Sequence, residues 1–321
     1  MIRLFLDNRT GVLFLLPFIV GVYALASILG LQVSPTLRAD GLFFHGVNIG
    51  SVASYIIQSL LILLNAVLLN AVFNSHEFLD KNTYIISLIY VVLTPMFIPL
   101  NSFDGSLLAH LFIILTMSVL FQLKQNSDGK MVVFNAGLLS SLGIIFLPYL
   151  LPVIPFLLMM IVVIRPFIWR ELFLCLAGIS VPLIYYFSYL FFTNQLGFSW
   201  LLPNWNMHNY QQALNNYPVV GLFAALLFIS LFSLGARLLK SSLRLKKQIQ
   251  MLGLLFAFFI LLGSVDFFFS GSLVYLSLAI IPLTYFLTYA FLSKRSGILA
   301  SIFFYITLLY SFVKFFISFT E

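Results

Sequence analysis

The sequence predicts an all-α fold: a polytopic transmembrane helix bundle of about eleven helices, forming a single transmembrane domain over residues 1–321. Hydrophobic residues make up 62% of the chain and charged residues only 8%, whereas soluble domains carry about 25% charged residues. The mean hydropathy is +1.11. Long apolar runs alternate with short polar turns, and every second turn is basic. These three observations indicate a membrane protein.

The charge pattern predicts the orientation. The formal net charge is +7, and of the 16 Lys and Arg residues all but Arg38 and Lys314 fall on one side of the predicted topology. This is the positive-inside pattern, so we expect a cytoplasmic N-terminus and an outer C-terminus. The basic run Lys240–Lys247 is typical of a loop that faces lipid phosphates and helps to fix the orientation. Because the charge lies in these loops, nucleic acid is not expected as a partner.

Each helix is predicted from an apolar run between polar turns. About 20 residues, at about 1.5 Å per residue, cross a hydrocarbon core about 30 Å thick. The first run has no small-residue cleavage site, so it is predicted to be a retained helix and not a signal peptide. The predicted helices cover residues 12–31, 52–73, 84–100, 107–121, 131–147, 151–164, 172–192, 219–239, 251–269, 273–292 and 298–319.

Two of these segments carry a further signal. The second helix has polar residues at spacings of four and seven, which form one stripe that should face other helices: Ser54, Gln58 and Asn65. The hairpin of residues 131–147 and 151–164 turns at Pro148–Pro155, and both of its members are short. The sequence leaves open whether this hairpin crosses the membrane fully.

The rare polar residues of the apolar regions gather toward the outer side. We predict three carboxylates as catalytic candidates, Asp40, Asp104 and Asp266. An acid about one turn below the interface, such as Asp266, is expected to be functional or paired, and Lys314 is the alternative partner. The alternatives for the other two are a turn carboxylate at Asp40 and a helix cap at Asp104. Three further residues on this side are predicted to bind substrate: Arg38, His45 and His110.

The longest polar interval, residues 193–217, mixes aromatic and amide side chains. Aromatic rings pack on the C–H faces of a sugar, and amides both donate and accept hydrogen bonds, so this loop predicts saccharide binding. An aromatic belt at the membrane interface is the alternative. The predicted substrate-binding residues here are Trp200, Trp205, Asn206, His208 and Tyr210.

No metal or cofactor is predicted. His76, Glu77 and Asp80 form HExxD, which lacks the second histidine of the zinc-binding helix motif, and a divalent cation at the outer carboxylates has no motif to support it. Cys175 is the only cysteine, so no disulfide is expected. The chain also lacks a Walker motif, an Arg-rich voltage-sensing helix and a convincing internal repeat.

From Asp104 to Phe192 the chain has an outer turn, a helix, an inner turn ending in Gly129 and Lys130, the run NAGLLSSLGIIFLPYLLPVIPFLLMMIVVIRPFIWRE, and a long helix. In this order of turns and helices it resembles the hydrophobic core of GT-C membrane glycosyltransferases. The whole chain resembles an uncharacterised family of polytopic inner-membrane proteins of Bacteroidetes. That second resemblance implies a multi-pass protein of the bacterial inner membrane and carries over no activity.

The GT-C resemblance implies inverting transfer of a sugar from a polyprenyl-phosphate donor on the periplasmic side. It implies Asp40 as the general base and Arg38 as a contact to the donor phosphate. The first outer loop has one acid where that family has an adjacent pair, which leaves a non-catalytic member open. The alternatives are a non-enzymatic scaffold or anchor subunit that binds other envelope proteins, and a transporter with Asp266 as its proton or cation site.

Overall fold

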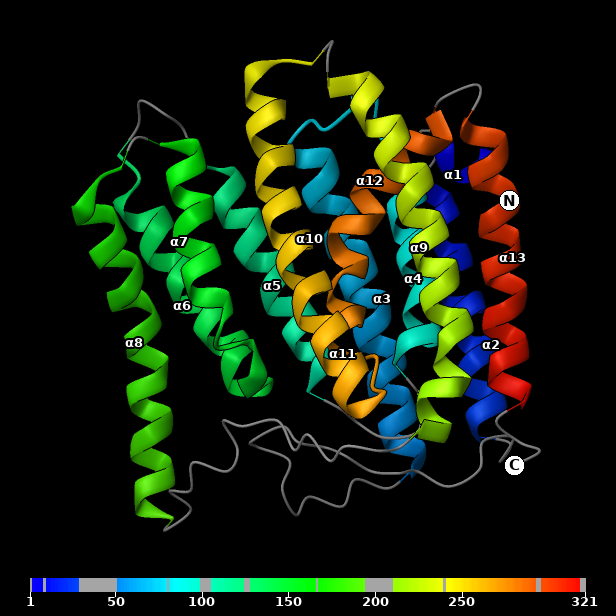
Figure 1. Cartoon of the computed structure of the whole chain (residues 1–321), viewed down its shortest axis with the longest axis horizontal. Coiled ribbons are helices and arrows are strands. Elements are labelled where there is room, and N and C mark those ends of the chain that lie inside the picture. Colours follow the sequence, from blue (N-terminus) through cyan, green and yellow to red (C-terminus); the bar gives the residue numbers. More distant parts are fainter. Residues whose placement is uncertain are drawn as a thin grey trace.

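The computed structural model describes residues 2–7, 10–28, 51–79, 81–98, 105–123, 128–165, 167–193, 210–238, 241–292 and 296–317. Within these ranges every regular element is a helix (Figure 1). In chain order they are α1 (Ile2–Leu6), the 3-10 helix η1 (Thr10–Leu15), α2 (Leu16–Ile28), α3 (Ser51–Ser75), α4 (Ile85–Phe97), α5 (Ser106–Phe121), α6 (Lys130–Phe146), the 3-10 helix η2 (Pro148–Leu150), α7 (Val153–Ile164), α8 (Trp169–Phe192), α9 (Tyr210–Leu238), α10 (Leu243–Ser270), α11 (Val274–Leu278), α12 (Ile280–Leu292) and α13 (Ser296–Ile317).

Most of these helices overlap the ranges that the apolar runs predict, which confirms the all-α class for the described residues, but the predicted helix 273–292 is two helices, α11 and α12. Five of them are long and apolar enough to cross a membrane, which makes the chain a membrane protein by the length and composition of its helices. The remaining apolar helices are 10–17 residues long. The five candidate spans are Ala53–Ser75, Trp169–Phe192, Asn216–Gly235, Leu243–Phe269 and Gly297–Lys314.

Two helices begin at least two turns earlier than the apolar runs indicate. Helix α9 begins at Tyr210, inside the predicted polar interval, and α10 begins at Leu243, inside the basic run. Hydropathy marks the part of a helix that meets lipid or core, whereas its backbone hydrogen bonds continue through polar residues. At the start of α10 the Oγ of Ser242 accepts a hydrogen bond from the backbone N–H of Leu245 at 3.3 Å, which caps the helix.

Two short helices, α4 and α12, lie at the centre. Every residue of α12 from Ile280 to Phe291 is buried, and so is nearly all of α4. A helix that is apolar on all sides belongs inside a protein, so these two need not match the length of a lipid-facing span. The predicted polar stripe of α3 also faces inward, with Ser54, Gln58 and Asn65 all buried.

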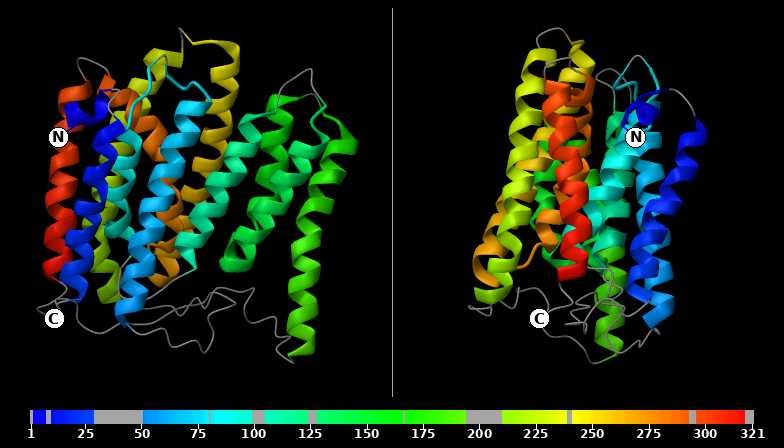
Figure 2. Two further views of the ribbon diagram at one scale, coloured as in Figure 1. Left: turned by 180° about the vertical axis from the view of Figure 1, so that it is seen from behind. Right: turned by 90° about the vertical axis from the view of Figure 1, so that its right-hand side faces the viewer.

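Helices α6, α7 and α8 lie together at one side of the bundle, packed on α5 and α10, and we call them the α6–α8 arm (Figures 1 and 2). Its closest contact joins α6 and α8: a Cβ at Gly137 would lie 2.3 Å from the Cys175 carbonyl oxygen, and one at Gly178 would lie 2.3 Å from that of Phe134. Small residues permit this approach of two backbones. Helix α7 has 12 residues, about 18 Å at 1.5 Å per residue, which is less than the thickness of a hydrocarbon core.

The two ends of the bundle differ in charge. Helix α9 ends and α10 begins at the end drawn uppermost in Figure 1, which we call the basic end. Its described basic side chains include Arg165, Arg170, Arg237, Arg244, Lys246 and Lys247. At the other end α10 finishes and α11 begins, with Asp266 close to the end of α10, and we call it the Asp266 end.

Candidate functional site

A buried hydrogen-bond network joins four helices in the middle of the bundle. His110 of α5 has no exposed surface, and its Nδ1 lies 2.8 Å from the hydroxyl oxygen of Tyr90 on α4. Its Nε2 lies 3.2 Å from the Oγ of Ser277 on α11. Asn65 of α3 donates to the carbonyl oxygen of Leu107 at 2.9 Å. The network therefore ties α3, α4, α5 and α11 together.

The hydrogen-bond partners of His110 indicate which of its ring nitrogens carries the proton. The hydroxyl of Ser277 donates to the carbonyl of Val274, so its oxygen accepts from an Nε2–H of the imidazole. The hydroxyl of Tyr90 then donates to the unprotonated Nδ1. A neutral ring with both nitrogens engaged satisfies the rule that buried polar groups are hydrogen-bonded.

Asp266 lies near the end of α10, beside the turn that leads to α11. It is 7% exposed, and its Oδ2 accepts a hydrogen bond from the Oγ of Ser272. Gly271 ends α10 in the left-handed region with φ 70°, and its N–H donates to the Phe267 carbonyl at 3.0 Å. Only glycine adopts this φ without strain, so Gly271 is what turns the chain and returns Ser272 to the carboxylate.

Lys314 and Asn216 lie at the same end of the bundle as Asp266. The Nζ of Lys314 on α13 donates to the Met96 carbonyl at 3.0 Å and to the Oδ1 of Asn216 at 3.1 Å. The Nδ2 of Asn216 on α9 donates to the Gly271 carbonyl at 2.9 Å. These two carbonyls lie at the C-terminal ends of α4 and α10, where helix oxygens lack intrahelical partners and a cation is favoured. We call Asp266, Ser272, Gly271, Asn216 and Lys314 the Asp266 cluster.

The short helix α11 connects the cluster with the central network. Ser272 precedes α11 and contacts Asp266, and Ser277 lies within α11 and contacts His110. The N–H of Val274 also donates to the Oγ of Ser272 at 3.4 Å. Two of the predicted site residues, Asp266 and His110, are thus brought to the two ends of one helix of 5 residues.

Most of the predicted site lies outside the described residues. This holds for Asp40, Asp104, Arg38, His45, Trp200, Trp205, Asn206 and His208. Tyr210 begins α9, and its side chain is also outside the description. His110 lies inside the bundle, with Tyr90 and Ser277 as its contacts. Lys314, the alternative partner of Asp266, reaches the same cluster through Asn216.

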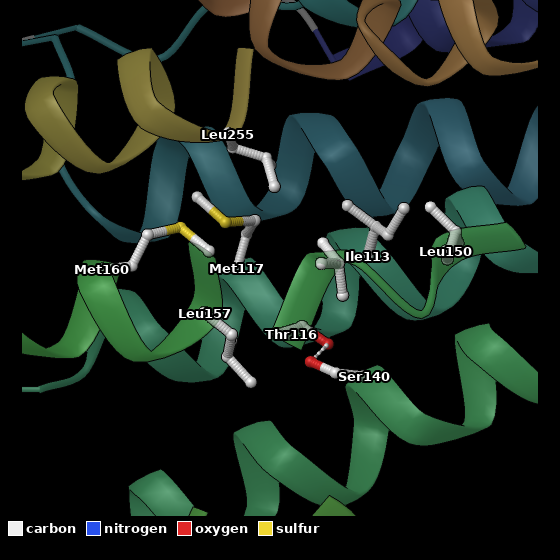
Figure 3. A pocket seen from close by; sticks show the side chains of 9 residues that line it. Ile113, Thr116, Met117, Ser140, Leu150, Leu157, Met160 and Leu255 are labelled. Atoms are coloured by element: carbon white, nitrogen blue, oxygen red, sulfur yellow. Dashed lines mark hydrogen bonds between the residues drawn. The ribbon is translucent and has the colours of Figure 1, made fainter. Parts of the chain in front are cut away.

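A small pocket lies elsewhere, between α5, α6, α7 and α10 (Figure 3). Its volume is about 20 Å³ and its lining is apolar apart from Thr116 and Ser140, which hydrogen-bond to each other at 3.4 Å. A space of this size holds about one water molecule, so it is a packing gap and not a substrate site. In the part of the chain that the structure describes, no group of three or more His, Cys, Asp or Glu side chains could hold a metal ion.

Sequence reasoning missed the partners of the two described site residues. Tyr90 and Ser277 were not among the predicted site residues, and Asn216 was included only as an amide of the polar interval 193–217, although each is a polar side chain in or beside an apolar run. Inside a membrane protein such a side chain needs a hydrogen-bond partner, so its polarity alone could have marked it as part of a polar cluster. Which partner it takes depends on the arrangement of the helices.

The fold and its buried polar clusters define a helical membrane protein. The chain belongs to the family of unknown function DUF6427, whose model matches residues 36–320. No curated protein and no solved structure matches the chain.

Proposed function

We propose that this chain is a multi-pass protein of the bacterial inner membrane that binds a polyprenyl-linked saccharide at its Asp266 end and transfers the sugar. About eleven helices cross or enter the bilayer, and the basic end faces the cytoplasm. One observation carries the proposal. Asp266 is a buried carboxylate that Ser272 holds at one end of the bundle. In the sequence, the predicted outer carboxylates and the aromatic, amide-rich loop lie in the segments next to the helix ends on this side.

In this proposal an acceptor hydroxyl attacks the anomeric carbon, the polyprenyl phosphate leaves, and Asp40 takes the hydroxyl proton. Arg38 contacts the donor phosphate, and residues of the loop around Trp205 grip the sugar. Asp104 and Asp266 support the acceptor from the end of the bundle. The fixed position of Asp266 suits this role, because a preorganised group loses little freedom when substrate binds.

Two carboxamide variants test the proposal. Asp40→Asn should lower sugar transfer from a labelled polyprenyl-phosphate donor in membranes by about 100-fold or more, since it removes the general base. Asp266→Asn should weaken binding of the acceptor, measured as a raised KM for the acceptor. The matched control is Asp128→Asn, because Asp128 is an exposed aspartate at the basic end that pairs with Lys130 at 3.2 Å. Transfer that is unchanged in both variants, at equal expression, would reject the enzyme.

A second candidate is the non-enzymatic scaffold subunit, and the exposed face of α8 favours it. Tyr185 is 76% exposed and Phe192 is 82% exposed, on a helix that packs mainly against α6. Aromatic residues are enriched where proteins bind one another. This candidate predicts envelope proteins that co-purify with the chain, and indifference to both Asp40→Asn and Asp266→Asn.

A further inference from the structure

Helix α11 takes its position from its neighbours. It has 5 residues, which is about one and a half turns, and helices shorter than about 12 residues are marginal on their own. Gly271 ends the helix before it in the left-handed region, and Ala279 separates it from α12. Contacts with other helices therefore decide how α11 lies.

Two contacts hold α11, each from a different helix. The first is close packing on α10, because a Cβ at Gly263 would lie 2.9 Å from the Cα of Leu276. The second is the hydrogen bond from the Nε2–H of His110 on α5 to the Oγ of Ser277, at 3.2 Å. Apolar packing is not directional, whereas a hydrogen bond weakens steeply when its angle changes. The packing therefore sets how close α11 lies, and the bond to His110 sets its rotation about its own axis.

The start of α11 holds the carboxylate of Asp266. Ser272 lies two residues before the helix, and its Oγ donates to the Oδ2 of Asp266 and accepts from the N–H of Val274 at 3.4 Å. Two serines are thus attached to one short helix, Ser272 at its first residue and Ser277 near its last. If the bond to His110 is lost and α11 rotates, Ser272 moves away from the carboxylate.

His110 is suited to hold α11 because it is itself fixed. Its ring has no exposed surface, and the hydroxyl of Tyr90 on α4 donates to its Nδ1 at 2.8 Å. A side chain so enclosed acts through its partners and not by touching a substrate. We propose that His110 is a positioning residue that sets the direction of the Asp266 carboxylate through Ser277 and α11. This role rests on the proposed function, in which the carboxylate supports the acceptor.

Carbodiimide labelling tests this role in the purified full chain in nanodiscs. Dicyclohexylcarbodiimide is an apolar reagent that modifies carboxyl groups inside membrane proteins, and mass spectrometry gives its rate at Asp266 relative to Glu171, a second buried carboxylate. Ser277→Ala should raise this ratio about three- to tenfold, the factor that one hydrogen bond between membrane helices provides. The matched control is Ser233→Ala, because Ser233 is a buried serine whose hydroxyl donates within α9, to the Ser230 carbonyl at 2.8 Å.

A ratio in Ser277→Ala no higher than in the control would overturn the role of His110. This includes the case in which both carboxylates react faster because the whole fold loosens. His110→Leu should also raise the ratio, and His110→Gln should restore most of the wild-type value, because glutamine has nearly the size of leucine but keeps an amide N–H for Ser277. Equal ratios in these two variants would contradict a hydrogen-bond donor at this position.

Sugar transfer separates this role from the proposed function. Transfer from a labelled polyprenyl-phosphate donor in membranes should fall in Ser277→Ala and not in Ser233→Ala. If the labelling ratio rises while transfer stays unchanged, His110 positions Asp266 but the carboxylate does not serve the acceptor, which rejects that part of the proposed function. If transfer falls without a rise in the ratio, the positioning role is overturned and the proposed function stands.

Discussion

The central bundle and the α6–α8 arm are held together in different ways. In the central bundle α3, α4, α5 and α11 are joined by hydrogen bonds around His110, and neighbouring side chains fill the remaining space. In the arm, α6 and α8 touch backbone to backbone at Gly137 and Gly178. The arm also has a small apolar cluster of its own, Ile145, Tyr186 and Leu190, separate from the main core.

The difference shows how a membrane protein holds helices together without a large hydrophobic driving force. Lipid tails are as apolar as leucine, so helices associate through close packing or through polar contacts. The arm relies on close packing, and the central bundle relies on directional contacts from His110 and Asn65. The arm adds one polar contact at the basic end, where Arg165 of the turn after α7 pairs with Glu171 of α8.

The largest effect should come from breaking this ion pair. Arg165 is 7% exposed and Glu171 is 6% exposed, so Glu171→Ala leaves a buried guanidinium without its carboxylate. We expect a loss of about 3–5 kcal/mol in the free energy of unfolding. Equilibrium unfolding in mixed micelles measures it. The double variant Arg165→Met with Glu171→Leu should recover most of the loss, because it removes both charges. A double variant as unstable as the single one would show that the uncompensated charge is not the cause.

The second effect should come from the helix contact in the arm. Gly137→Ala would place a Cβ 2.3 Å from the Cys175 carbonyl oxygen and force α6 and α8 apart, at a cost of about 1–3 kcal/mol. Cys175 is the sole cysteine and is fully buried, so its rate of reaction with a maleimide reports the separation. Labelling should rise in the variant.

Gly221→Ala is the matched control for this prediction. Gly221 lies in α9, and a Cβ there would meet no atom within 4 Å. Alanine is a better helix former than glycine, so this variant should be unchanged or slightly more stable, by about 0.5–1 kcal/mol at most. If Cys175 reacts equally fast in both variants, close packing at Gly137 does not hold the arm together.

The two regions were also predictable to different degrees. The helices follow from apolar runs, because a chain in lipid must satisfy its backbone hydrogen bonds within each helix. The early starts of α9 and α10 do not follow, since polar residues continue a helix without any hydropathy signal. The contact of Gly137 with Cys175 can be predicted only when the helices that pack against α6 are known, and the composition of the chain does not reveal them.

At the candidate site, single residues could be predicted from the sequence, but the contacts between them could not. Asp266 stands out as an acid in an apolar run, and His110 as an imidazole in another. That Asp266 meets Ser272 just before α11, while His110 meets Ser277 within it, depends on the turn made by Gly271. That Asn216 bridges Lys314 to this turn depends on how α9, α10 and α13 meet. Such contacts join residues far apart in sequence, so spacing alone does not reveal them.

The smallest of the three effects should come from the central network. Tyr90→Phe removes the hydroxyl that donates to the Nδ1 of His110 and leaves the ring in place. Hydrogen bonds between membrane helices contribute about 0.6 kcal/mol on average and about 1.7 kcal/mol at most, so we expect a loss in this range. Tyr305→Phe, at a tyrosine of α13 that is 42% exposed, is the control and should change nothing. A loss no larger than in the control would mean that the hydrogen bond between Tyr90 and His110 does not stabilise the central bundle.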